Sequence, residues 1–265
     1  MRKLCYITLI VLLTLTGCQW QMRTSDEQRQ PEGVVFDRFD QVESVYLTMA
    51  DYSALHQMRT DYPLQTRTLI ENVLQLGPVD DPNINNRLLL FFQDSTLQTI
   101  IADVAQQYAN TDGLQRDLTK AFSRLSDMLP DMQVPHIYTQ VGSLDQSIVV
   151  SDSLLGISLD KYLGADYPAY LHYGYSEQQR MMMTRDYIVP DCLGFYLLSL
   201  YPMPEEADTV TAMRHFHMSK IQCVVNQAMG RHVFSNDNIA QLDKFLAEHP
   251  HYSTDLFLRL DSIPH

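Results

Sequence analysis

Residues 134–159 read VPHIYTQVGSLDQSIVVSDSLLGISL and contain three short runs rich in β-branched and apolar residues. Turn-forming residues separate these runs, first at Gly142-Ser143 and then at Ser151-Asp152-Ser153. Short runs of this kind, divided by turns, are typical of a small antiparallel meander. We therefore expect strands over residues 134–140, 147–150 and 155–159.

Helical periodicity surrounds this segment on both sides. Before it, the apolar spacing predicts helices over residues 40–58, 64–77 and 95–129, the last with a break at 110–113, while Leu88–Phe92 reads as a further buried strand. After it, helices are predicted over residues 176–201, with an interruption at Pro190, and over 210–229 and 238–248. The pattern predicts an α+β fold, in which one mostly helical domain over residues 34–265 holds a small, largely antiparallel sheet.

The N-terminus has the three-part layout of a secretory signal. Arg2 and Lys3 are followed by an almost wholly apolar run, Leu4–Leu15, which is too short to span a bilayer. Leu15-Thr16-Gly17-Cys18 resembles the bacterial lipobox, whose cysteine is lipidated and becomes the new N-terminus. We expect residues 1–17 to be a lipoprotein signal peptide and Cys18 to be the site of lipid attachment.

A polar stretch over residues 18–33 lacks apolar periodicity and reads as a flexible tether between the lipid and the domain. Gln19 stands where some lipoproteins carry the aspartate that retains them at the inner membrane. The expected location is therefore the outer membrane, with the domain facing the periplasm.

The chain is acidic, with a formal net charge of −13, and loss of Arg2 and Lys3 with the signal peptide increases this excess. We expect no basic patch that would neutralise phosphates, which argues against nucleic acid as a partner. It also argues against direct adhesion to anionic headgroups, so the acyl chains would hold the membrane.

Signatures of catalysis are missing from the sequence. No His-Glu-x-x-His zinc helix, Gly-x-Ser-x-Gly elbow, phosphate-binding Walker loop or dinucleotide fingerprint occurs. His215 and His217 are two residues apart, so on a helix they point to different sides. We expect no enzymatic activity, no metal and no cofactor.

Three further features leave alternatives open. Cys192 and Cys223 would form a disulfide in an oxidising periplasm, or fill apolar space as free thiols. Met181–Met183 would line an adaptable groove or fill the core. Asp152, Asp160 and Asp166 would face one pocket or cap turns.

A cluster of tyrosines follows the predicted meander and is the candidate interface, because tyrosine offers a large contact area with a polar tip. The alternative is that these rings fill and cap the core. The interface prediction names Asp160, Tyr162, Asp166, Tyr167 and Tyr170.

Several stretches recur in a characteristic order between residues 34 and 201: Phe36–Asp40, Leu74–Gly77, Phe91–Asp94, Ala121-Phe122 before Leu129-Pro130, and Gly156–Gly164 followed by Asp166, Tyr167 and Tyr170. Through these stretches the chain resembles the gliding-motility B lipoprotein family of Bacteroidota. The resemblance implies an envelope lipoprotein, required for surface gliding in members that glide, with a zincin-like fold that lacks the zinc motif here.

Two functions are therefore expected from the sequence. The first is a non-catalytic, lipid-anchored envelope protein that docks another envelope component in the gliding machinery or a related process. The alternative is a metal-dependent, peptidase-like hydrolase with an atypical ligand set, for which His172 or His215 and nearby carboxylates are the candidates.

Overall fold

The computed structural model describes residues 33–151, 153–204 and 211–262. The signal peptide, Cys18 and nearly all of the tether lie outside the described residues, as does Asp152. From Gly33 onward the chain forms one compact unit. Nearly all of its buried apolar side chains belong to one core that extends from Val34 to Leu258.

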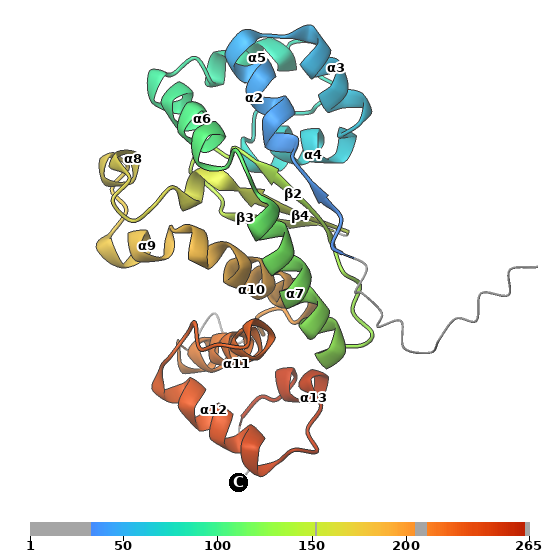
Figure 1. Ribbon diagram of the computed structural model, residues 1–265, viewed down its shortest axis with the longest axis vertical. Coiled ribbons are helices and arrows are strands. Elements are labelled where there is room, and N and C mark those ends of the chain that lie inside the picture. Colours follow the sequence, from blue (N-terminus) through green and yellow to red (C-terminus); the bar gives the residue numbers. More distant parts are fainter. Residues whose placement is uncertain (1–32, 152, 205–210, 263–265) are drawn as a thin grey trace, which may run out of the picture. The chain divides into compact units, whose positions relative to one another are not determined.

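A four-stranded sheet lies at the centre of this unit (Figure 1). Its strands are β1 (Phe36–Asp37), β2 (His136–Gln140), β3 (Ile148–Ser151) and β4 (Leu154–Ser158), in the order β1-β2-β4-β3. All five residues of β4 are buried, and so are the last four of β2, because helices pack on the sheet. Where β2 and β4 pair, Tyr138 lies beside Gly156, and a side chain at Gly156 would meet the tyrosine ring.

The three strands predicted within residues 134–159 are present, but the largely antiparallel arrangement is wrong. β1 and β4 both run parallel to β2, and within the described residues only β3 and β4 pair antiparallel. The reason is that β4 pairs between β2 and β3, while β3 lies at the edge. The observed fold is mostly helical with a small mixed sheet, which agrees with the α+β class, and the zincin-like resemblance stays a prediction.

The helices that precede β2 are shorter than the sequence predicts. The first predicted helix is divided into two helices in the structure, α2 (Phe39–Met49) and α3 (Tyr52–Thr60). The division occurs because Ala50 adopts a left-handed conformation and Asp51 caps α3. The second consists of α4 (Pro63–Arg67) and a π-helical segment, η1 (Thr68–Val73). The break predicted at 110–113 is confirmed between α6 (Ser95–Gln107) and α7 (Asp112–Met128).

The strand predicted at Leu88–Phe92 is wrong, because these residues belong to α5 (Ile84–Phe91) and its C-cap. Ile84 and Leu88, four residues apart, are buried, whereas Leu90 is exposed. Burial of one helical face explains the apolar run, since such short runs do not by themselves distinguish a strand from a buried helix.

After β4 the chain forms three short segments, η2 (Leu159–Tyr162), α8 (Pro168–His172) and α9 (Glu177–Met182), before η3 (Arg185–Tyr187) and α10 (Ile188–Leu200). The predicted interruption falls before α10, at Met183-Thr184, rather than at Pro190. Pro190 is the third residue of α10, where its missing N–H has no helical acceptor to lose.

The C-terminal helices are α11 (Thr211–Met229), α12 (Asp237–Glu248) and α13 (Thr254–Leu258). α10 packs on β3 and β4 and contacts α7 and α11 (Figure 1). Cys192 in α10 and Cys223 in α11 are buried free thiols, which agrees with their role as small hydrophobic residues. No described helix is both long enough and apolar enough to cross a bilayer.

Candidate functional site

The turn after β2 is held in a conformation that its residues do not favour. Ser143 and Leu144 both have positive φ, 55° and 66°, a region that L-residues with side chains rarely occupy. The buried Asp160 carboxylate stabilises this turn by accepting hydrogen bonds from Gly142 N at 2.7 Å and Leu144 N at 2.5 Å. Burial raises the pKa of Asp160, while these two hydrogen bonds lower it.

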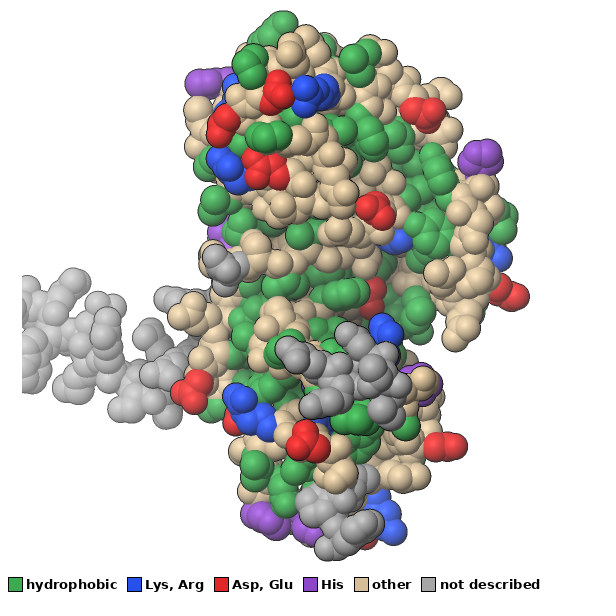
Figure 2. All heavy atoms as spheres, turned by 180° about the vertical axis from the view of Figure 1, so that it is seen from behind, with side chains coloured by type: hydrophobic (Ala, Val, Ile, Leu, Met, Phe, Trp, Pro, Cys, Tyr) green, Lys and Arg blue, Asp and Glu red, His purple; other side chains and the backbone are tan. Residues whose placement is uncertain are grey.

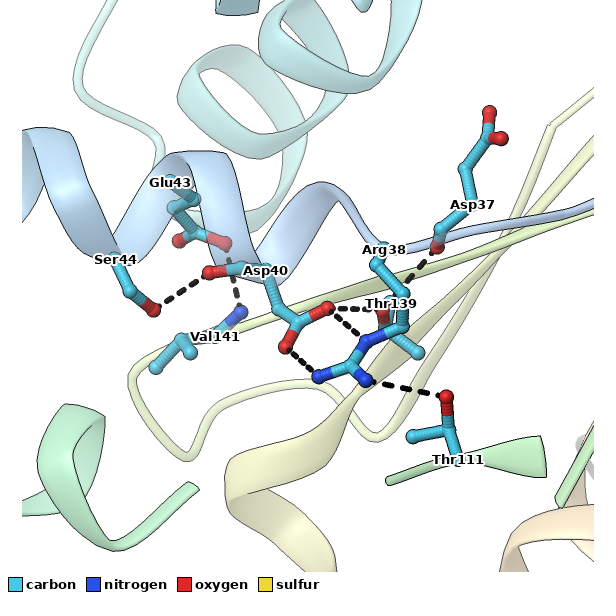
Figure 3. A network of polar contacts seen from close by, with 8 residues as sticks. All are labelled: Asp37, Arg38, Asp40, Glu43, Ser44, Thr111, Thr139 and Val141. Carbon is cyan, nitrogen blue, oxygen red and sulfur yellow. Dashed lines mark hydrogen bonds and ion pairs between the residues drawn. The ribbon is translucent and has the colours of Figure 1, made fainter. Parts of the chain in front are cut away.

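A second set of acidic side chains joins α2 to the same end of β2 (Figure 3). Arg38 donates to both oxygens of Asp40 at 2.8 Å, and Asp40 also accepts from the Thr139 hydroxyl. Glu43 Oε2 accepts from Val141 N at 2.9 Å. Two stretches that carry the family resemblance, Phe36–Asp40 and Gly156–Gly164, therefore both form hydrogen bonds to the end of β2 or to the turn that follows it.

Glu43 is the least satisfied acid of this network. Its side chain is fully buried, and its Oε1 has no hydrogen-bond partner. Burial raises the pKa of Glu43 well above its ordinary value, and the negative charges of Asp40 and Asp160 raise it further. A neutral carboxylic acid at this position costs less free energy than an ionised one.

Next to the turn, an apolar cavity of about 330 Å³ opens between α9, α10 and α11. Two residues at its rim, Met182 and Phe195, are 42% and 43% exposed. Hydrophobic side chains also gather in a hollow beside the α8–α9 segment on the face drawn in Figure 2. Much of the cavity wall is apolar, formed by side chains that include Met182, Met183, Phe195, Leu198, Met218 and Ile221.

One side of this cavity is polar. Asp191 Oδ2 accepts from the Tyr162 hydroxyl at 2.7 Å. Burial raises the pKa of Asp191 to about 6, although this hydrogen bond and the positive charge of Lys161 both lower it. Lys161 Nζ donates to Leu144 O at 3.1 Å and to Tyr175 Oη at 2.9 Å. The cavity therefore combines apolar walls with a few fixed polar groups, as binding sites commonly do.

The structure separates the residues predicted to form an interface. Asp160, Tyr162 and Tyr170 are buried, and Tyr170 Oη donates to Asp160 O at 2.6 Å, so these three side chains offer a partner no surface. Tyr167 is half-buried and bonded to Asp103, and Asp166 is exposed. The structure therefore agrees with the alternative of core filling for the three buried residues, and Asp160 and Asp166 do not face one pocket.

Sequence reasoning missed Asp191 and Gly194 as cavity residues. The available signal was that Asp191 is a lone charge, and Gly194 a helix-weakening residue, within the apolar run Ile188–Leu200. The groove alternative for Met181–Met183 fits the structure in part, because Met182 and Met183 line the cavity and Met181 is exposed.

The histidines do not converge. His172 and His215 are exposed, whereas His217 is buried with its Nε2 3.0 Å from Tyr201 O. Among the residues that the structure describes, no group of three or more His, Cys, Asp or Glu side chains is placed to hold a metal ion. The metal-dependent alternative thus has no support in this part of the chain.

Comparison with known proteins identifies a matching family model. The family model described as "Gliding motility protein GldB" matches residues 19–231, which is most of the chain. No curated protein and no solved structure is significantly similar to it.

Proposed function

We propose, because the chain belongs to the gliding motility protein GldB family, that it is a non-catalytic, lipid-anchored envelope protein. It acts in the cell-surface gliding machinery or in a related envelope process. The family match supports a gliding-motility lipoprotein, and the lipobox-like stretch before Cys18 supports the anchor.

The anchor is proposed at Cys18, with the folded unit tethered to the outer membrane and facing the periplasm. Several acyl chains hold a protein far more firmly than one, since each buried methylene contributes about 0.8 kcal/mol. Palmitate labelling of cells tests this directly. The label should be lost in Cys18→Ala, and labelling that persists in this variant would contradict the anchor.

The docking surface is proposed at the apolar cavity between α9, α10 and α11, and the exposed apolar rim at Met182 and Phe195 is the observation that carries this proposal. Exposed apolar patches with polar edges are typical of sites where proteins associate. The partner is an envelope protein that inserts an apolar side chain. The buried Tyr162 does not contact the partner, and its role is to hold Asp191 in the cavity wall through their hydrogen bond.

Photocrosslinking in intact cells tests the docking surface. A photoreactive residue at position 195 should capture one defined envelope protein, and the same residue at exposed Leu90 on α5 is the matched control. Gly194→Phe, which fills the cavity, should abolish the product at position 195. Equal capture from both positions, or a product that survives Gly194→Phe, would overturn the proposal.

A further inference from the structure

A second cavity, of about 240 Å³, lies where α7, η3 and the C-terminal end of α11 meet. It differs from the docking cavity in charge. Its lining includes four basic side chains and two acidic ones: Lys120, Arg124, Arg185 and Arg231, with Asp117 and Asp186. This excess of positive charge stands out in a chain whose formal net charge is −13.

α7 contributes a row of like charges. Arg116, Lys120 and Arg124 follow one another at intervals of four residues and therefore lie on one face of the helix. Like charges at this spacing destabilise a helix. Arg185 continues the cluster from η3, because a Cβ at Gly113 would lie within 4 Å of the guanidinium groups of both Arg185 and Arg116.

Among the residues that the structure describes, these cations form no salt bridge. In the described part of the chain, Arg38, Arg67, Arg87, Arg180 and Arg259 all form salt bridges. No salt bridge is found there for any of the basic residues of the cluster, which are Arg116, Lys120, Arg124, Arg185 and Arg231.

One guanidinium is fixed in place at the cavity. Arg124 Nη1 donates to Ala228 O at 3.3 Å and to Met229 O at 2.8 Å, the last carbonyls of α11. The Arg124 side chain lies against Gly230, whose φ of 68° and missing side chain leave room for it. Among the described residues, its Nη2 and Nε have no hydrogen-bond acceptor, so they remain available to a ligand.

We propose that this cavity binds a phosphate group. Basic side chains from three segments converge, which suits the several oxygens of a phosphate better than the two of a carboxylate. Four cations and two acids leave two positive charges in the lining. A phosphomonoester carries about 1.5 to 2 negative charges near neutral pH. The group belongs either to a lipid headgroup or to a soluble phosphate.

Binding of inorganic phosphate to the whole chain with Cys18→Ala, measured by calorimetry at constant ionic strength, tests the proposal. We expect saturable binding that weakens about fivefold in Arg185→Gln and in Arg231→Gln, within the range of exposed ion pairs. Arg214→Gln is the matched control, because Arg214 is exposed on α11 but does not line the cavity. Asp186→Asn should strengthen binding, an effect that a purely structural role would not produce.

Vesicles distinguish the two sources. If the group is a lipid headgroup, phosphatidic acid vesicles should bind the chain and lose binding in Arg185→Gln, while phosphatidylcholine vesicles should not bind. If it is a soluble phosphate, inorganic phosphate should bind and lose affinity in Arg185→Gln, while phosphatidic acid vesicles should not bind. The proposal would be overturned if neither inorganic phosphate nor phosphatidic acid vesicles bound saturably. It would also be overturned if Arg214→Gln weakened binding as much as Arg185→Gln.

Discussion

Gly194 is a cavity residue whose substitution should stabilise the fold. It lies in the middle of α10, and an added Cβ would meet no heavy atom within 4 Å. A glycine inside a helix is about 0.8–1.0 kcal/mol less favourable than alanine. Gly194→Ala should therefore raise the free energy of unfolding by up to about 1 kcal/mol, which corresponds to a rise in Tm of about 2–4 °C for a chain of this size.

Gly156→Ala is the matched comparison, because it makes the same chemical change in β4. There the Cβ would lie 2.6 Å from two atoms of the Tyr138 ring system, Cζ and Oη. Overpacking of this kind typically costs about 1–3 kcal/mol. We therefore expect Gly156→Ala to lower the Tm.

Urea and thermal unfolding followed by far-UV circular dichroism measure both changes. A lower stability of Gly194→Ala would refute the open space inferred beside Gly194, and an unchanged stability of Gly156→Ala would refute the close packing of Tyr138. Both variants replace glycine by alanine but should change the free energy of unfolding in opposite directions. An error in the unfolding baseline would shift both values in the same direction and so could not produce this result.

Three further predictions concern buried groups. Asp160→Asn should lose at least one charge-assisted hydrogen bond to the turn and about 1.5–3 kcal/mol of stability in urea unfolding, while the exposed Asp166→Asn should change it by less than about 0.5 kcal/mol. Folding raises the pKa of Glu43, so the native state loses stability as pH rises from the unfolded pKa of about 4.3 toward the higher folded pKa. The free energy of unfolding of Glu43→Gln minus that of wild type should therefore increase over this range, and a constant difference would contradict this. Cys192 and Cys223 should resist alkylation in the native protein and both react after denaturation, as read by mass spectrometry, whereas a disulfide would block both sites throughout.

Local signals in the sequence were sufficient for many elements. The break between α6 and α7 was predictable because Asn110, Asp112 and Gly113 are turn-forming residues, and in the structure Asn110 Oδ1 accepts from Asp112 N at 2.8 Å just before α7. β2, β3 and β4 were predictable from their short apolar and β-branched runs, but β1 and the pairing of the strands were not. The order β1-β2-β4-β3 depends on contacts between distant segments, including a β1 that is only two residues long.

The sites depended still more on tertiary contacts. Tyr162 and Tyr170 were expected at a surface, but η2 and α8 turn these rings into the core. No basic patch was expected from the acidic sequence, but α7, η3 and the residue after Gly230 bring Lys120, Arg185 and Arg231 to one cavity. Cations that are distant in sequence become neighbours only after folding, so net charge did not reveal them.

Complementation of a deletion strain tests most directly whether the apolar cavity carries the function of this gliding-motility family member. Wild type and Leu90→Gln should restore the envelope or surface-movement phenotype. Gly194→Phe should accumulate at the membrane, folded, and fail to restore it. Full restoration by Gly194→Phe would contradict docking through this cavity.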